Sequence, residues 1–186
     1  MFVDFSKAYD RLDRRKLLAI LKRLGCGCIM LTAIAAMYMS TKSILCTAVI
    51  AAHIGVRQGS PTSCLLFVIY LNELVRAYRT RSKPDGYLGW LHCLLLMDDT
   101  VILANNRERC KDKFEIMTDF CEDVGVSINV KKTMFMVIKG NAEDREPITS
   151  GRSTIHHCDS YTYLGSLFLE DTSFTSFLKA HTADKK

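Results

Sequence analysis

The chain has 186 residues, of which 48% are hydrophobic and 24% are charged, and its formal net charge is +5. This length accommodates one domain with a real hydrophobic core and hardly two. The composition is that of an ordinary globular protein, which argues against a fibrous or disordered chain. The positive excess is compatible with a polyanionic partner but does not require one.

The eight cysteines form no Cys-x-x-Cys pair and no repeating metal spacing, and most of them lie in apolar runs. We therefore predict buried free thiols in a reducing, intracellular compartment. The densest group of zinc-type ligands is His156-His157-Cys158. It lacks a second ligand pair at a suitable spacing, so we interpret it as structural.

No signal peptide and no membrane partner are expected. Met1 is followed at once by Phe-Val-Asp, without a basic region that leads into an apolar stretch. The apolar region from residue 26 to residue 56 is interrupted too often for a membrane span, by Ser40, Thr41, Lys42 and His53.

The first 51 residues predict a strand, two helices and a second strand. Residues 2–5 are typical of the end of a buried strand, with Asp4 as a lone charge at its tip. Residues 29–39 are apolar almost all round and predict a buried helix, and residues 43–51 predict a strand. Between them Asp13 is suited to cap a helix that Gly25 ends and whose inward face carries Leu17, Ile20, Leu21 and Leu24.

Residues 55–86 predict a loop, a helix and a second loop. Ser60 suits the N-cap of the helix and Pro61 its first position. The helix extends to about Tyr78. The charges of residues 79–86 fit a solvated loop and a phosphate contact equally well.

The most informative stretch is residues 93–104, where apolar residues lead into Asp98-Asp99 and out again. Two short apolar runs joined by a polar step predict a buried β-hairpin with both carboxylates at its tip. Neighbouring carboxylates repel each other when ionised, and a shared proton or a bound cation relieves this. Mg²⁺ prefers oxygen ligands and leaves positions open for water or phosphates. When the pair is taken alone, an ordinary Asp-Asp turn is the favoured alternative.

The last part of the chain predicts one helix and several short strands. The helix covers residues 107–124, with Phe114, Met117 and Phe120/Cys121 inward and Gly125 at its end. Helices and strands mix without a regular βαβ alternation, so the predicted fold class is α+β around an antiparallel sheet. The remaining segments are strands over 126–130 and 133–138, an exposed loop over 139–152, and a strand or hairpin over 161–168.

Five stretches resemble the catalytic motifs of reverse transcriptases, particularly those of non-LTR retrotransposons, and they occur in that family's order. Each motif alone is weak, but together they cover about residues 1–168. The five are FVDFSKAYD from Phe2 to Asp10; GVRQGSP from Gly55 to Pro61, followed by Leu66-Phe67 and Asn72-Glu73-Leu74; Leu96-Met97-Asp98-Asp99; Gly125 through Asn129 to Lys132-Thr133; and Tyr163-Leu164-Gly165.

The resemblance implies a palm-like antiparallel sheet packed against helices. It also implies an RNA-directed DNA polymerase that adds dNTPs to a DNA primer on an RNA template, located in the nucleus. The cofactor would be Mg²⁺, with Mn²⁺ possible, as two ions ~3.5–4 Å apart that act on the attacking and leaving oxygens. Asp4 and Asp98 would bridge the metals, Asp99 would support them, and the carbonyl of Phe5 would add a ligand.

The resemblance also implies residues that contact the substrates. Tyr9 matches the aromatic position that floors the sugar pocket and excludes a 2′-hydroxyl, with a plain core tyrosine as the alternative. Gln58 and Gly59 precede a helix N-terminus, whose free N–H groups suit contact with nucleotide or template. Lys132 resembles the lysine proposed to protonate the departing pyrophosphate, with a solvated turn lysine as the alternative. The implied primer contacts are Leu96, Met97, Tyr163, Leu164 and Gly165.

Two departures from the family pattern bear on activity. Leu96 stands where the family has an aromatic residue that leans on the primer end. We also expect residues 1–170 to be a partial palm domain and residues 171–186 to fray, because fingers would precede the first motif and a thumb would follow the last. We therefore expect weak nucleic-acid binding and poor primer extension by this chain. The alternative function is a catalytically inactive palm that binds only nucleic acid or protein, and the oligomeric state stays open.

Overall fold

The computed structural model describes residues 1–39, 42–45, 48–51, 54–57, 59–151 and 153–171. Its centre is a six-stranded sheet in the order β5-β6-β1-β8-β10-β9. Neighbouring strands are antiparallel except β8 and β10, which are parallel. The predicted α+β class is confirmed, with this one parallel pair as an addition. The strands are β1 (Phe2–Val3), β5 (Cys93–Leu96), β6 (Asp99–Ile102), β8 (Met134–Phe135), β9 (Ile148–Ser150) and β10 (Ser153–His157).

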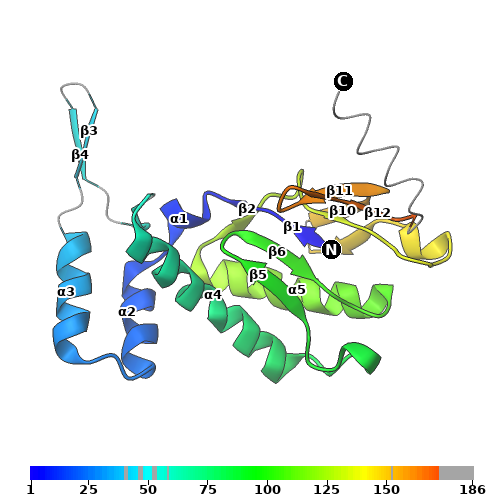
Figure 1. Ribbon diagram of the computed structural model, residues 1–186, viewed down its shortest axis with the longest axis horizontal. Coiled ribbons are helices and arrows are strands. Elements are labelled where there is room, and N and C mark those ends of the chain that lie inside the picture. The colour runs from blue at the N-terminus through cyan, green and yellow to red at the C-terminus, as the bar shows by residue number, and fades with distance from the viewer. Residues whose placement is uncertain (40–41, 46–47, 52–53, 58, 152, 172–186) are drawn as a thin grey trace.

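Helices α4 (Pro61–Arg81) and α5 (Arg107–Val124) pack beside each other against the sheet (Figure 1). Helix α4 begins at Pro61 as predicted but runs on to Arg81 instead of Tyr78. Helix α5 has its predicted bounds, since the Asn106 side chain accepts from the Arg109 N–H at 2.8 Å and Gly125 ends the helix with φ 75°. The buried faces of the two helices supply much of the core, including Phe67, Tyr70, Leu74, Tyr78, Phe114, Met117 and Cys121.

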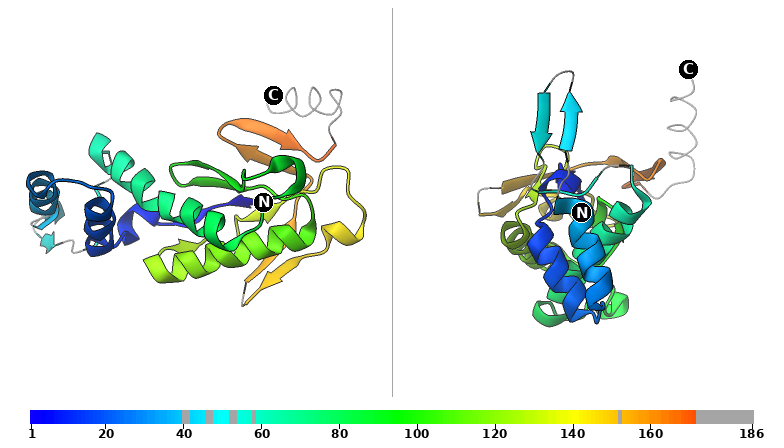
Figure 2. Two further views of the ribbon diagram at one scale, coloured as in Figure 1. Left: turned by 90° about the horizontal axis from the view of Figure 1, so that it is seen from below. Right: turned by 90° about the vertical axis from the view of Figure 1, so that its left-hand side faces the viewer.

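Three helices form the end of the molecule away from β9: α1 (Ala8–Arg11), α2 (Arg14–Arg23) and α3 (Cys28–Met39) (Figures 1 and 2). Asp13 caps α2 as predicted, and its carboxylate accepts from the N–H groups of Arg15 and Lys16. Leu24 was expected inward but is 55% exposed, because it follows the last helical residue.

The expectation that residues 29–39 form a buried helix is wrong in one respect. The helix is present, but the side chains of Ile29 and Met30 are 89% and 58% exposed. The reason is its position, since α3 packs beside α2 at the edge of the molecule and not against the sheet (Figure 1).

Three other segments differ from their predictions. The single strand expected over residues 43–51 is a hairpin of β3 (Lys42–Leu45) and β4 (Ala48–Ala51). The loop expected over residues 139–152 contains the 3-10 helix η2 (Glu143–Arg145) and strand β9. Strand β10 was not predicted. The sequence pattern does not predict β9 and β10, because Ile148 and Ile155 are the only apolar residues in these strands. Both residues are buried.

Two further two-stranded sheets and a 3-10 helix, η1 (Gly86–Leu88), complete the described fold. Strand β2 (Phe5–Ser6) pairs with β7 (Ser127–Ile128). A strand or a hairpin was predicted over residues 161–168, and the structure has the hairpin, formed by β11 (Ser160–Tyr163) and β12 (Ser166–Leu169). Its turn residues Leu164 and Gly165 both have positive φ, 52° and 75°, as a type I′ turn requires. No helix in the described part of the chain is both long and apolar enough to cross a membrane.

Candidate active site

Strand β1 carries Asp4 to the Asp98-Asp99 hairpin. The antiparallel register pairs Phe2 with Val101 and Val3 with Thr100, so Asp4 continues the ladder opposite Asp99. Asp98 lies in the turn between β5 and β6 after Met97, whose φ is 55°, and Asp99 begins β6. The hairpin is the predicted one, but β5 is not buried: Leu94 and Leu96 are 45% and 52% exposed because β5 is the edge strand of the sheet.

The three carboxylates influence one another. Partial burial, and then the negative charges of Asp98 and Asp4, raise the pKa of Asp99 above its usual range. Among the described residues, no ion pair joins any of the three to Lys, Arg or His. The described part of the fold therefore gathers negative charge here without an ion-paired cation.

Asn129 and Thr133 hold Asp4 in place. The side-chain Nδ2 of Asn129 donates to Asp4 Oδ2 at 2.9 Å, and its backbone N–H donates to the Asp4 carbonyl at 2.8 Å. The Asp4 N–H donates to Thr133 Oγ1 at 3.3 Å. The sequence placed both residues in a motif without giving them a role, because nothing in the local pattern links them to Asp4, 125 and 129 residues earlier.

Three tyrosines border the carboxylates. Burial, then Cys64 and Asp98, raise the pKa of Tyr9 to about 12, while its ring stacks on Phe67 with centroids 4.4 Å apart. The hydroxyl of Tyr163 donates to the Asp99 carbonyl at 3.5 Å. Burial and then the charges of Asp4 and Asp99 raise the pKa of Tyr161. Tyr161 was missed, although its spacing of two from Tyr163 places both on one face of β11.

The β11–β12 hairpin reaches the site through aromatic contacts. The ring of Phe2 stacks on Tyr161 at a centroid distance of 4.2 Å and an interplanar angle of 7°. Phe2 also contacts Tyr163 and Phe168, each at 6.0 Å between centroids. Because Phe2 is two residues before Asp4 in extended backbone, these contacts set the hairpin on the same face of the sheet as the carboxylates.

The loop before α4 lies against the segment that follows Asp4. The N–H of Gly55 donates to the Leu12 carbonyl and that of Val56 to the Tyr9 carbonyl, both at 2.8 Å. Gly55 has φ 78°, and a Cβ there would lie 2.6 Å from the Asp10 carbonyl oxygen. Gly59 is exposed with φ 83° and open space around it, just before the N-terminus of α4. Gln58 lies outside the described residues.

The other predicted site residues lie around this centre. Phe5 is buried and pairs with Ile128. Lys132 is exposed in the turn that holds Asp4, and its carbonyl accepts from the Tyr161 hydroxyl at 3.5 Å. Leu96, Met97 and Leu164 are exposed, at 52%, 42% and 50%, and Gly165 completes the β11–β12 turn.

The donor set suits a hard divalent cation, since it consists of carboxylate oxygens without a paired base. Oxygen atoms of Asp4, Asp98 and Asp99 do not all lie within 4.8 Å of one another. Among the described residues, ligand atoms of His157, Asp159 and Glu170 do lie that close together. The carboxylate donors of the three aspartates are therefore of the type that binds divalent cations.

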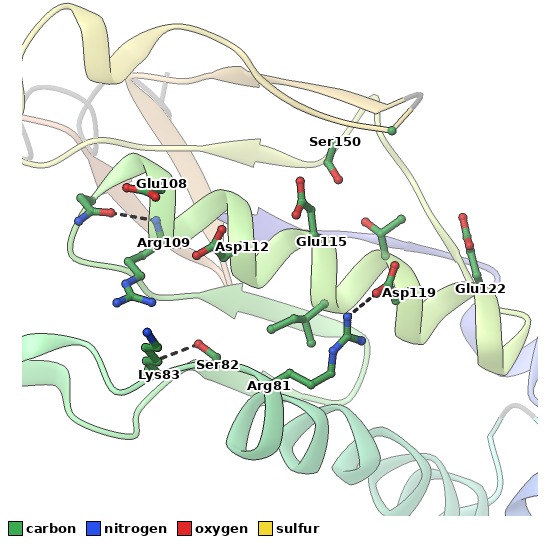
Figure 3. A pocket seen from close by; sticks show the side chains of 14 residues that line it. Arg81, Ser82, Lys83, Glu108, Arg109, Asp112, Glu115, Asp119, Glu122 and Ser150 are labelled. Atoms are coloured by element: carbon green, nitrogen blue, oxygen red, sulfur yellow. Dashed lines mark hydrogen bonds and ion pairs between the residues drawn. The ribbon is translucent and has the colours of Figure 1, made fainter.

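A hollow on the molecule belongs to a different surface. It lies between the C-terminal end of α4, α5 and the turn after β9 (Figure 3). Arg81, at the end of α4, forms an ion pair with Asp119 of α5 at 2.5 Å (Figure 3). None of the residues predicted for the active site lines it.

A protein-family model matches this arrangement of motifs over residues 1–168: reverse transcriptase (RNA-dependent DNA polymerase). The chain belongs to the reverse transcriptase family. The family resemblance predicted from the five motifs is thereby confirmed.

Two curated relatives come from one class of mobile element. The retrovirus-related Pol polyprotein from type-1 retrotransposable element R2 of Nasonia vitripennis is 27% identical over 183 residues, which is 89% of this chain and 18% of that protein. The corresponding polyprotein from type-2 retrotransposable element R2DM of Drosophila melanogaster is 24% identical over 123 residues, 61% of this chain and 12% of that protein. This reverse transcriptase sequence thus spans less than a fifth of the relatives that it matches.

Proposed function

We propose that the chain is the palm region of an RNA-directed DNA polymerase of a non-LTR retrotransposon, which adds dNTPs to a DNA primer on an RNA template. The observation that carries the proposal is the meeting of Asp4 with Asp98-Asp99 at one edge of the β1–β6 ladder. A nuclear location goes with this proposal, since the template, the target DNA and the dNTPs would meet there.

The chain's own residues would share the work as follows. Asp4, Asp98 and Asp99, with the Phe5 carbonyl, would hold two Mg²⁺ or Mn²⁺ ions, which activate the attacking hydroxyl and stabilise the leaving oxygen. Asn129 would hold the Asp4 carboxylate, and Thr133 the Asp4 backbone, in a fixed position beside the hairpin. Catalysis of this kind rests mainly on positioning and electrostatic stabilisation, so these supports matter as much as the ligands.

The other predicted residues would contact the nucleic acid and the nucleotide. Tyr9, beside Asp98, would form the floor of the sugar pocket, and Gly59, with Gln58, would approach the nucleotide or template at the start of α4. Lys132 would donate a proton to the departing pyrophosphate. The primer end would lie against Leu96, Met97 and the β11–β12 turn residues Tyr163, Leu164 and Gly165.

Primer extension on a poly-purine RNA template with Mg²⁺ or Mn²⁺ tests the proposal in two proteins. The first is the 186-residue chain, for which we expect weak template binding and little extension. The second is a chimera in which residues 1–168 replace the aligned segment of the Nasonia vitripennis polyprotein. We expect the chimera to extend primers and Asp98→Asn in the chimera to abolish extension. A folded chimera that binds primer–template as its parent does, yet does not extend it, would contradict the proposal.

A further inference from the structure

Three side chains of metal-ligand type meet at the base of the β11–β12 hairpin, outside the candidate active site. His157 ends β10, Asp159 precedes β11 and Glu170 follows β12. One ligand atom from each lies within 4.8 Å of the other two. The N–H of Glu170 donates to the Asp159 carbonyl at 2.8 Å, which closes the base of the hairpin. The fold therefore brings together ligands from three separate segments.

The imidazole of His157 is placed between two carboxylates. Its Nδ1 lies 3.5 Å from Asp159 Oδ1, and its Nε2 lies 3.4 Å from Glu170 Oε2. A neutral imidazole has one donor and one acceptor nitrogen, and an ionised carboxylate only accepts. In one of the two contacts, therefore, the lone pair of an imidazole nitrogen faces an ionised carboxylate, and these two groups repel each other unless a cation is present. Nε2 is buried and makes no hydrogen bond with the described residues.

Arg145 pairs with one of the two carboxylate oxygens of Glu170 and leaves the other available to a metal ion. Arg145 Nε donates to Glu170 Oε1 at 2.7 Å, and its guanidinium also forms an ion pair with that oxygen. The hydrogen bond from Arg145 is the main cause that lowers the pKa of Glu170, which keeps this carboxylate ionised. Glu170 Oε2 faces His157 instead. The side chain of Asp159 is 89% exposed, so it can reorient toward a bound ion without disturbing the core.

We propose that His157, Asp159 and Glu170 bind one divalent transition-metal ion, with Zn²⁺ as the ion of choice. One imidazole nitrogen and two carboxylate oxygens form a ligand set that Zn²⁺ accepts, and water completes a four-coordinate site. Magnesium is a poorer occupant, because it prefers oxygen ligands and near-ideal octahedral geometry.

The position of the ion would matter for the hairpin. It would tie both ends of β11–β12 to β10, and this hairpin carries Tyr161 and Tyr163 beside Lys132 and Asp99. A bound ion would therefore fix the hairpin against the sheet. The proposal does not rest on polymerase activity, since the site contains none of the aspartates of the candidate active site.

Isothermal titration of the metal-free 186-residue chain with Zn²⁺ tests the site. We expect one ion per chain, and we expect Asp159→Asn and Glu170→Gln to weaken binding at least ~10–100-fold, a loss that even an outer-shell partner typically causes. His157→Ala should abolish binding. His156→Ala is the matched control, because His156 is the exposed neighbour on the same strand. Cys158→Ser and Asp98→Asn should also leave Zn²⁺ affinity unchanged.

Four outcomes would overturn the proposal. Equal affinity in His157→Ala and His156→Ala would place the ion elsewhere, and loss of binding in Asp98→Asn would move it to the active site. Binding only at millimolar Zn²⁺ would mean an adventitious ion only. A His157 ring that ¹⁵N NMR shows doubly protonated at neutral pH, and unchanged by Zn²⁺, would mean that an imidazolium serves as the cation. Because Asp159 is exposed, Asp159→Asn keeps the test valid if His157→Ala fails to fold.

Discussion

Asn129 joins Asp4 through two hydrogen bonds, one from its side chain to Oδ2 at 2.9 Å and one from its backbone N–H to the carbonyl at 2.8 Å. The side-chain bond occupies one oxygen of the carboxylate, Oδ2. Asn129 is therefore a positioning residue for Asp4.

Removing that amide should loosen Asp4 more than it harms the fold. We expect Asn129→Ala to lower Mg²⁺ affinity, measured by titration of the metal-free chain, by ~10–100-fold. In the chimera, primer extension should fall by a similar factor and recover in part at high Mg²⁺. Asn141→Ala, in an exposed loop, is the control. Unchanged affinity in Asn129→Ala would show that Asp4 needs no support from this amide.

The Asp98 carboxylate should decide how the protein responds to metal. A ligand that binds only the folded state stabilises it by about 2.7 kcal/mol at a free concentration 100 times Kd. We expect Mg²⁺ to raise Tm by mass action and Asp98→Asn to remove this response. Without metal, Asp98→Asn should melt at a higher temperature than the wild type, because one of three repelling charges is gone. Equal responses to Mg²⁺ would place the ion elsewhere.

The raised pKa of Asp99 predicts a pH dependence of stability with a definite sign. The folded state binds the proton more tightly than the unfolded state, whose carboxyl titrates near its reference value of about 3.9. The contribution of Asp99 to the stability of the folded state is therefore fully present below that reference value. It is lost as the pH rises through the pKa that Asp99 has in the folded state.

Urea unfolding across this pH range checks the sign. Relative to the wild type, Asp99→Asn should gain stability as pH rises through the folded pKa and then level off. Saturating Mg²⁺ should remove the trend, because the ion replaces the proton as the balancing charge. A stability difference that stays constant with pH would mean that the neighbouring charges do not act on Asp99.

The ion pair of Lys113 with Asp85 is fully buried and should dominate the stability of α5. Lys113 is 0% exposed, contacts the Asp85 carboxylate and donates to the Leu103 carbonyl at 2.5 Å. Removing one partner of a buried pair leaves an uncompensated charge, which costs about 3–5 kcal/mol. We expect Lys113→Met to lose that much in urea unfolding. Lys111→Met, in an exposed pair with Glu115 on the same helix, should change stability by less than about 1 kcal/mol.

Gly55 and Gly59 form a matched pair for testing the close approach of the loop to residues 9–12. Their φ angles are 78° and 83°, but only at Gly55 would a Cβ meet backbone atoms. The left-handed conformation costs Ala about 1–2 kcal/mol at either position. Gly55→Ala should cost about 1–3 kcal/mol more through overpacking. Equal losses of unfolding free energy would show that the loop moves aside without cost.

The sequence by itself determined the elements whose signals are local. Asp13 and Asn106 cap the N-termini of α2 and α5 through hydrogen bonds within a few residues, and the backbone angle of Gly125 ends α5. These two helices were therefore predictable almost to the residue. The Asp98-Asp99 turn was predicted for the same reason, whereas residues 161–168 were predicted only as a strand or a hairpin. The order of five short motifs also sufficed to predict the family.

Tertiary structure alone decided which distant groups meet. Asn129 contacts Asp4 across 125 positions, and nothing local to either residue encodes that distance. The apolar pattern of residues 29–39 predicts a helix, but the exposure of that helix depends on its position beside α2 and away from the sheet. His157, Asp159 and Glu170 converge only because β11–β12 closes on itself beside β10. Side-chain pattern fixes local conformation, whereas packing and strand register, which sum over the whole chain, fix the site.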